Sequence, residues 1–432
     1  MPLLSRSHRA LIWAAAALAA TALAPRAGAE ALLVIEAETG KVLHSENAGN
    51  PWYPASVTKL MTAYSVLRAI KEGRLTPEKA VKVSAAAAAQ QPVKMGFPVG
   101  TLVTVDNALK MMMVRSSNDM AVVLAEAVSG SIENFADEMN RNARRLGMIQ
   151  STFVNPNGLP ADDQITSARD LGILSRALIR EFPEHDQYWH IPAIKMGKTV
   201  MRNYNSLIGR YPGADGMKTG FICASGFNLV ASATRDNKRL IAVVLGASSS
   251  QARALKAAQL LERGFNSNTG LGWLVPSLGT VETIPTVSAA PPNLREDMCG
   301  AHRKRQATED EDEALGANVP ADSPYALLLS SLRAPKTKGA ALMQEVNTGE
   351  PVVVYTGPHR KPGEPIPMID PPKPKVAGKP KPGAKTAAGN GSASDTDSAA
   401  KPKPKPKSTT AKPAPKPSQT STDAAQQTTQ AR

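Results

Sequence analysis

Hydrophobic residues form short, strand-like runs near both ends of the segment from Glu30 to Gly264. Apolar runs that alternate with polar residues, or that turn residues bound, predict β-strands. Five runs fit this description: Ala31–Glu36, Lys41–Ser45, Met217–Ile222, Phe227–Thr234 and Leu240–Ala247. Turn-forming residues join two pairs of these runs. Ala37–Gly40 lies between the first and second runs, and Arg235–Lys238 lies between the fourth and fifth, so two hairpins are predicted.

Between these runs, apolar residues recur at the three- and four-residue spacing of an amphipathic helix. Helices are predicted from Ser56 to about Gly73, and over Asn107–Met113, Met120–Val128, Glu133–Leu146, Ser167–Arg180 and Ala252–Arg263. The polar stretch Val114–Asp119 is predicted to be a loop, and Gly264 to end the last helix. This order predicts an α/β chain of the α+β type, in which the first strands join the last ones in one sheet and a helical region is inserted between them.

The pattern weakens after about Leu274, so we place the folded domain at residues 30–274. Residues 275–370 have the composition of a linker, with proline pairs, a basic patch and an acidic run, and the apolar island Val352–Tyr355 leaves room for a small β remnant. In residues 371–432, Lys-Pro repeats and Ser, Thr and Ala tracts cannot bury a core. We therefore predict a largely disordered C-terminal tail.

Residues 1–29 have the layout of a secretory signal peptide. Arg6 and Arg9 precede the apolar run Ala10–Leu23, and Ala27-Gly28-Ala29 provides a small-residue cleavage site. As a helix the run spans about 21 Å, less than the ~30 Å hydrocarbon core, which favours cleavage after Ala29 over an uncleaved anchor. The mature chain is then expected outside the cytoplasm, in the periplasm or cell envelope.

Positive charge is concentrated at the two ends of the chain. The formal charge is +14, of which residues 371–432 carry +9 and residues 1–29 carry +3, leaving +2 for residues 30–370. A protein that binds nucleic acid carries basic residues on the fold itself, so this distribution argues against a nucleic-acid partner.

Cysteine and histidine are too few and too scattered for a metal site. The two cysteines and six histidines show no zinc-site spacing. Outside the cytoplasm Cys223 and Cys299 could form one disulfide, and two free thiols are the alternative.

Ser56-Val57-Thr58-Lys59 is the first candidate for catalytic chemistry. Residues i and i+3 share one face of a helix, so the Ser56 hydroxyl and the Lys59 amine become neighbours at the predicted helix start. A serine nucleophile needs a base, and a lysine can serve when its pKa falls from ~10.4 toward ~7. Taken alone, the pattern also fits a capping serine beside a solvated lysine.

Two further motifs follow along the chain. Ser116-Ser117-Asn118 lies in the predicted loop, where Ser116 could relay a proton and Asn118 could hold a substrate amide. Lys218-Thr219-Gly220 lies on a predicted strand, where Lys218 supplies a cation and Gly220 permits close approach of a substrate backbone. Each motif alone is ordinary, but the order S-x-x-K, S-x-N, K-T-G at separations of 60 and 102 residues is specific.

Together the three motifs resemble the signature of the penicillin-recognising serine enzymes. Residues 54–63, 155–159 and 215–220 are similar to the low-molecular-mass penicillin-binding proteins, the serine-type D-alanyl-D-alanine carboxypeptidases, and the resemblance runs from about Glu30 to Gly264. It implies the β-lactamase/transpeptidase-like fold, an antiparallel sheet with an inserted helical region. It further implies peptidoglycan stem peptides as substrate, β-lactams as inhibitors, no cofactor, and a role in cell-wall maturation and cell shape.

The resemblance implies a catalytic role for three residues. Ser56 is the nucleophile that becomes acylated, Lys59 is its general base, and Ser116 passes the proton to the leaving D-alanine. The residues expected to bind substrate are Asn118, Lys218, Thr219, Gly220, Phe221 and Arg253. Asn118 would position the acyl part, Lys218, Thr219 and Arg253 would hold the terminal carboxylate, and the backbone N–H groups of Ser56 and Phe221 would form the oxyanion hole. Many relatives have histidine where Phe221 stands, so a side-chain contact at this position is not carried over.

Three other functions compete with this interpretation. A D,D-endopeptidase, which cuts peptidoglycan cross-links, uses the same residues. A class A β-lactamase needs a deacylating glutamate after the second motif, and Ile149–Asn155 contains no acid. A non-catalytic wall-binding protein would act through its basic tail, which we expect either to contact anionic membrane or wall polymer or to serve as a passive spacer.

Overall fold

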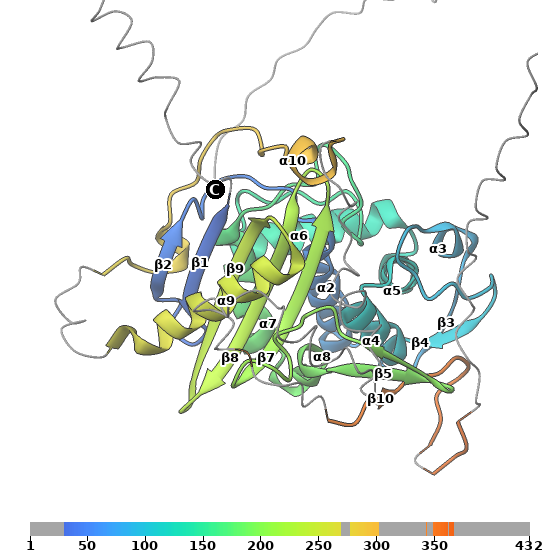
Figure 1. Cartoon of the computed structure of the whole chain (residues 1–432). Coiled ribbons are helices and arrows are strands. Elements are labelled where there is room, and N and C mark those ends of the chain that lie inside the picture. The colour runs from blue at the N-terminus through green and yellow to red at the C-terminus, as the bar shows by residue number, and fades with distance from the viewer. Residues whose placement is uncertain (1–29, 269–276, 302–342, 344–348, 362, 367–432) are drawn as a thin grey trace, which may run out of the picture. The chain divides into compact units, whose positions relative to one another are not determined.

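A five-stranded antiparallel sheet organises the described part of the chain, which in this computed structural model comprises residues 30–268, 277–301, 343, 349–361 and 363–366. Its strand order is β2 (Val42–Glu46), β1 (Ala31–Glu36), β9 (Lys238–Ala247), β8 (Gly226–Arg235) and β7 (Ala214–Ile222). Leu33 of β1 lies opposite Val243 of β9, so the first strand joins the last ones, as predicted (Figure 1). β7 is left at one edge of the sheet.

Both predicted hairpins are confirmed. β1 pairs with β2, and β8 pairs with β9 across a turn in which Asp236 and Asn237 have φ angles of 47° and 59°. Two consecutive positive φ angles are typical of the type I′ turn, which matches the twist of the flanking strands, and Asp and Asn tolerate this conformation best after glycine.

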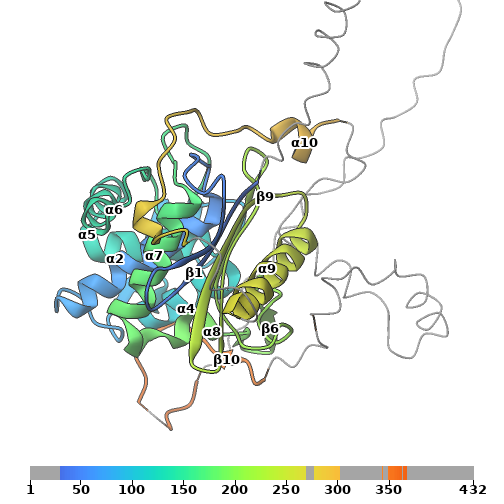
Figure 2. The same ribbon diagram turned by 90° about the vertical axis from the view of Figure 1, so that its left-hand side faces the viewer.

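Helices cover both faces of this sheet. α9 (Ser250–Phe265) packs on one face and α7 (Ala168–Glu181) on the other (Figure 2). The longer helices on the α7 side are α2 (Lys59–Lys71), α4 (Val105–Arg115), α5 (Asn118–Ser129) and α6 (Ile132–Leu146). Shorter ones are α3 (Ala85–Ala89), α8 (Gln187–His190) and α10 (Arg295–Cys299), together with the 3₁₀ turns η1 (Ala55–Thr58), η2 (Pro183–His185), η3 (Asn266–Asn268) and η5 (Val281–Thr283).

Two predicted helix boundaries are wrong, and each has a physical reason. The loop between α4 and α5 shrinks to Ser116 and Ser117, because the left-handed backbone of Ser116 ends α4 and the Ser117 carbonyl oxygen already accepts the Ala121 N–H of α5. Gly264 lies inside α9, where a Cβ atom would come within 2.8 Å of the Leu240 side chain. This glycine therefore permits close packing of α9 on the sheet rather than ending the helix.

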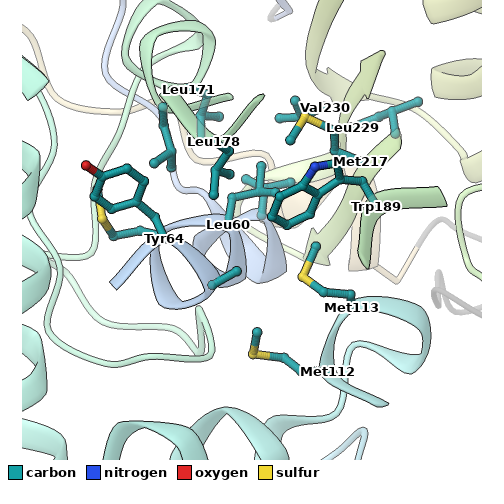
Figure 3. Close-up of a cluster of buried hydrophobic side chains, with 14 of the residues drawn as sticks. Leu60, Tyr64, Met112, Met113, Leu171, Leu178, Trp189, Met217, Leu229 and Val230 are labelled. Atoms are coloured by element: carbon teal, nitrogen blue, oxygen red, sulfur yellow. The ribbon is translucent and has the colours of Figure 1, made fainter. Parts of the chain in front are cut away.

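The buried core surrounds α2 and fixes the start of this helix relative to β7 (Figure 3). Leu60 and Tyr64 of α2 are fully buried. Their neighbours in the cluster come from α4, α7, α8 and the sheet: Met112, Met113, Leu171, Leu178, Trp189, Met217, Leu229 and Val230. At about 25 cal/mol per Å² of buried apolar surface, each large side chain contributes roughly 2 kcal/mol.

Two small sheets complete the fold. β3 (Ala80–Lys82) pairs with β4 (Leu102–Thr104), and β5 (Ala193–Met196) lies between β6 (Thr199–Arg202) and β10 (Val352–Val353). β10 pairs in parallel with β5, so part of the apolar island Val352–Tyr355 is a strand.

Residues 277–301, which the sequence suggests are linker, follow the surface of the folded core. Thr280 pairs with Lys41, the Val281 side chain is fully buried, and Cys299 of α10 is disulfide-bonded to Cys223. The predicted signal peptide and basic tail lie outside the described residues. In the ranges that are described, every helix is too short or too polar to cross a membrane.

Candidate active site

Ser56 lies in η1, immediately before α2 and against the edge strand β7. Asn228 of β8 fixes this entry, because its Nδ2 donates to the carbonyl oxygens of Tyr53 and Pro54 at 3.0 Å each. Ala55 has a φ of 50°, a conformation that is costly for a residue with a Cβ atom and often occurs at functional sites. The backbone before Ser56 is therefore held in place by the sheet.

The Lys59 side chain is fully buried and reaches three oxygen atoms. Its Nζ lies 3.0 Å from Ser56 Oγ, 2.7 Å from Asn118 Oδ1 and 2.6 Å from the Asn157 carbonyl oxygen. The first motif thus forms the serine–lysine pair expected from its spacing, and Asn118 of the second motif joins it.

These three contacts suit a lysine that exchanges one proton with Ser56. The two carbonyl oxygens can only accept, so each takes an N–H of Lys59. The Ser56 hydroxyl can either accept a third N–H from the ammonium form or donate its O–H to the lone pair of the neutral amine. The proton can therefore pass from Ser56 to Lys59 without a change of partners.

Ser116 and Lys218 form a second pair in the same site. Ser116 ends α4 with a φ of 57°, and its hydroxyl accepts a hydrogen bond from Lys218 Nζ at 2.9 Å. Lys218 Nζ also donates to the carbonyl oxygen of Thr219 at 2.9 Å, and both side chains are almost completely buried. The second and third motifs are thus brought together across 102 residues of sequence.

A network around Asn118 connects the second motif to the segment before it. Asn118 Nδ2 donates to the Gln91 carbonyl oxygen at 2.8 Å. The neighbouring Asp119 carboxylate accepts the backbone N–H groups of Met95 and Gly96. Burial raises the pKa of Asp119 above its ordinary value, although these backbone donors act in the opposite direction. Both polar groups of the Asn118 amide are therefore already engaged before a substrate binds.

Gly220 of β7 makes the closest approach to the nucleophile. A Cβ atom on this residue would lie 2.8 Å from the Ser56 nitrogen and 2.9 Å from the Val57 nitrogen, both of them backbone atoms. The strand thus lies against the helix start, next to the two backbone N–H groups, of Ser56 and Phe221, predicted to form the oxyanion hole. The Phe221 ring packs against that of Phe227, with ring centres 4.3 Å apart and an angle of 30° between the ring planes.

We expect Gly220→Ala to slow acylation by penicillin by about 10²-fold, because the added methyl group must push β7 away from Ser56. Stopped-flow labelling with a fluorescent penicillin measures this rate, and the thermal unfolding temperature shows whether the fold is kept. An alanine variant that is acylated at the wild-type rate would contradict the close approach.

Thr219 and Arg253 are both buried beside this strand. Thr219 Oγ1 has no hydrogen-bond partner within the described residues, so it can still bind a ligand. Arg253 Nη1 lies 3.4 Å from the Gly220 carbonyl oxygen and 3.3 Å from that of Asn228. The guanidinium therefore supports β7 from the α9 side, and its predicted contact with a substrate carboxylate stays a prediction.

Sequence reasoning missed three residues that shape the site. Asn157 supplies a carbonyl oxygen to Lys59, Asn228 holds the backbone before Ser56, and Asp119 holds the segment beside Asn118. A polar residue inside an apolar run, as at Asn228, is the signal that could have indicated one of them, because a buried amide requires partners.

Comparison with known proteins places these motifs in a family. The model of the D-alanyl-D-alanine carboxypeptidase family (peptidase S11) matches residues 18–249. The chain is 35% identical over 244 residues to D-alanyl-D-alanine carboxypeptidase DacF of Bacillus subtilis (strain 168), covering 55% of this chain and 62% of the relative. It is 37% identical over 249 residues to DacC of Escherichia coli (strain K12), covering 56% of this chain and 62% of the relative. The chain thus matches less than two thirds of the length of these curated relatives.

Solved structures show the same fold. Penicillin binding protein 5 from Haemophilus influenzae aligns with a TM-score of 0.52 at 34% identity, and DacD from Francisella tularensis with 0.54 at 31% identity. Each alignment covers 54% of this chain and 70% of the other chain. The expected fold is therefore confirmed. Because the family model spans more than half of its length, the chain belongs to the D-alanyl-D-alanine carboxypeptidase family.

Proposed function

We propose that this chain is a serine-type D-alanyl-D-alanine carboxypeptidase that removes the terminal D-alanine from peptidoglycan stem pentapeptides and is acylated by β-lactams. The contact of Lys59 Nζ with Ser56 Oγ, at 3.0 Å in a buried site that all three motifs surround, carries this proposal. Family membership supports the substrate class and the role in cell-wall maturation and cell shape.

Acylation begins when Lys59, as the neutral amine, takes the proton of the Ser56 hydroxyl. Ser56 Oγ then bonds to the carbonyl carbon of the penultimate D-alanine, and the oxyanion accepts the backbone N–H groups of Ser56 and Phe221. The peptide C–N bond breaks as Ser116 delivers its hydroxyl proton to the leaving amine and takes in exchange the proton that Lys59 gained from Ser56. D-alanine departs, and Lys59 is again the neutral amine. Lys218 and Thr219 bind the terminal carboxylate, since Lys218 is a cation and the Thr219 hydroxyl has no hydrogen-bond partner among the described residues.

Deacylation repeats these steps with water in place of the peptide amine. Lys59 activates the water, which attacks the ester carbonyl carbon, and the tetrahedral intermediate releases the trimmed peptide and restores the Ser56 hydroxyl. A β-lactam acylates Ser56 in the same way, but its leaving group stays tethered to the acyl part.

We expect wild type to be labelled by a fluorescent penicillin and to release D-alanine from a stem pentapeptide, and Ser56→Ala to do neither. Ser45→Ala, on the exposed surface of β2, is the matched control and should behave as wild type. Labelling that persists in Ser56→Ala would refute the assignment. Faster hydrolysis of a cross-linked peptide dimer would instead identify an endopeptidase, and rapid turnover of the penicillin a β-lactamase.

We also propose that the protein is exported, with its signal peptide removed after Ala29, and that the +9 tail associates with anionic membrane or wall polymer. The relation to cell-wall enzymes supports export. Deleting residues 371–432 should then abolish salt-sensitive retention in the envelope fraction, and unchanged retention would identify the tail as a spacer.

A further inference from the structure

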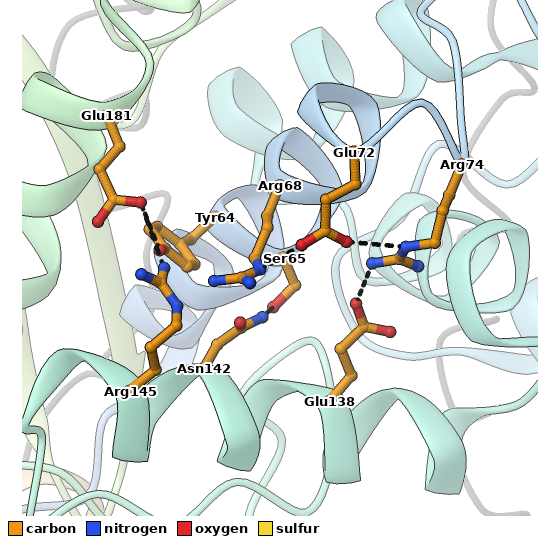
Figure 4. Close-up of polar contacts among 9 residues, drawn as sticks. All are labelled: Tyr64, Ser65, Arg68, Glu72, Arg74, Glu138, Asn142, Arg145 and Glu181. Atoms are coloured by element: carbon orange, nitrogen blue, oxygen red, sulfur yellow. Dashed lines mark hydrogen bonds and ion pairs between the residues drawn. The ribbon is translucent and has the colours of Figure 1, made fainter.

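A polar pocket lies between the end of α2 and the helix α6, and Figure 4 shows several of the side chains that line it. Arg68 comes nine residues after Lys59, about 13 Å along the helix axis. The pocket has a volume of about 360 Å³ and is lined by Arg68, Glu72, Arg74, Glu138, Arg141, Asn142 and Arg145. Since every lining residue is polar or charged, a ligand here would be polar.

Both carboxylates of the pocket are already saturated by partners from the protein. Glu72 accepts Arg68 Nε at 2.7 Å and Arg74 Nε at 2.9 Å. Glu138 accepts Arg74 Nη2 at 2.6 Å and the Ser129 hydroxyl at 2.7 Å. Although burial acts to raise the pKa of Glu72, the hydrogen bonds from Arg74 and Arg68 hold it below its ordinary value. Glu72 is therefore charged at neutral pH.

The four guanidinium groups of the pocket exceed its two carboxylates, which leaves a local charge of +2. Arg145 donates one N–H to Glu181, outside the pocket lining, and lies over the Tyr64 ring. Arg141 is exposed and has no carboxylate or hydrogen-bond partner within the described ranges. Side chains of Arg68, Arg74 and Arg145 are 31%, 41% and 39% exposed, so their remaining N–H groups can reach a solute.

The surroundings cancel part of this charge, because the Glu181 carboxylate forms an ion pair with Arg145 at 3.2 Å and leaves a local charge of +1. The carbonyl oxygens in the last turn of α2 would repel an anion, but Arg68, Ala69 and Ile70 already accept backbone N–H groups from residues 72–74. A neighbouring pocket of about 320 Å³ differs, because Leu146, Ile173 and Ala177 line it and Arg176 is bound by Glu282. The excess of guanidinium groups over carboxylates is thus a property of the pocket between α2 and α6, and not of its neighbour.

We propose that this pocket binds a dianionic phosphate group, free or at the end of a lipid headgroup. Guanidinium groups approach from α2, from the turn after it and from α6, so they can address several oxygens of a tetrahedral anion at once. A planar carboxylate pairs with one guanidinium group that lies in its own plane, and it leaves the other guanidinium groups of the pocket without a ligand. The net positive charge of the pocket favours an anion over a neutral ligand.

Isothermal titration of the full chain with inorganic phosphate, at about pH 8 and constant ionic strength, tests the site. Arg141→Gln removes an exposed guanidinium that has no partner to lose, and it should weaken binding by about tenfold. Arg144→Gln is the matched control, because Arg144 is an exposed arginine on the same helix that does not line the pocket. It should change the affinity less than about twofold.

Loss of binding in Arg141→Gln alone supports the proposal, and binding to vesicles with phosphatidic acid that Arg141→Gln weakens identifies a lipid source. Absence of saturable binding by wild type, equal weakening by the two variants, or equally tight binding of succinate would overturn it. Penicillin acylation should be unchanged in both variants, so failure here and failure of the proposed function are distinguishable.

Discussion

Replacing Lys59 with methionine is expected to lower the rate of acylation by a penicillin at least ~10³-fold. Methionine is of similar length and fills the buried volume, but it cannot accept the proton of the Ser56 hydroxyl. It also leaves Asn118 Oδ1 and the Asn157 carbonyl oxygen without the N–H donor that lies 2.7 and 2.6 Å away in the wild type. The rate is measured with a fluorescent penicillin under single-turnover conditions.

Two controls separate the loss of a base from the loss of the fold. Lys71 is an exposed lysine on the same helix, and its Nζ donates to the Glu181 carbonyl oxygen. The Lys71→Met variant should be acylated at the wild-type rate. Lys59→Arg keeps a buried cation but not a neutral amine, and it should stay inactive. Rapid acylation of a folded Lys59→Met protein would show that another group takes the proton.

The architecture of the sheet was predictable because it depends on local patterns. β1 and β9 contain continuous apolar runs, β8 has an apolar run interrupted by polar residues such as Asn228, and Asp236 and Asn237 suit the turn between β8 and β9. The order of elements then restricted how the strands could pair. The boundary at Ser116 was predicted wrongly because Asn118 and Asp119, polar residues typical of a loop, form the first turn of α5.

The candidate catalytic residues were predictable from three short motifs, whereas the residues that hold them in place were not. Lys59 and Ser56 meet because a helix turn places them together, which spacing alone reveals. The Asn157 carbonyl oxygen and the Asn228 amide act through long-range contacts, 98 and 174 residues from their partners. Every residue has a backbone carbonyl oxygen, so the sequence does not indicate which one will contact Lys59. Such contacts can be found only once the fold has brought the segments together.

The region after residue 274 shows the limit of reasoning from composition. Pro, charged and small residues in 277–301 are typical of a linker, yet Val281 is buried and α10 is joined covalently to the turn between β7 and β8. One buried side chain and one disulfide fix a segment without adding a recognisable hydrophobic pattern. The alternative of two free thiols is thereby excluded for this structure, in which the described residues contain no free cysteine.

Replacing both Cys223 and Cys299 with serine is expected to destabilise the protein by about 3 kcal/mol, with acylation changed less than about threefold. The disulfide closes a loop of 76 residues. Without it the unfolded chain gains conformational entropy, which stabilises the unfolded state by about 4 kcal/mol. Catalysis should survive because Trp52 Nε1 still donates to the Ser225 carbonyl oxygen, at 3.0 Å, and holds the same turn from the side of Ser56. For a domain of this size the unfolding temperature should fall by about 10 °C.

Reductant provides the matched control for this stability effect. It should lower the unfolding temperature of the wild type and leave the double variant unchanged, because the variant has no thiol to reduce. Mass spectrometry after alkylation should find no reactive thiol in the native protein and two after reduction. If instead both cysteines are alkylated in the native protein, or the double variant unfolds at the wild-type temperature, the cross-link does not stabilise the fold. If the double variant keeps its fold but loses acylation, the disulfide to α10 is needed to position β7, and the hydrogen bond from Trp52 is not enough to hold the turn between β7 and β8.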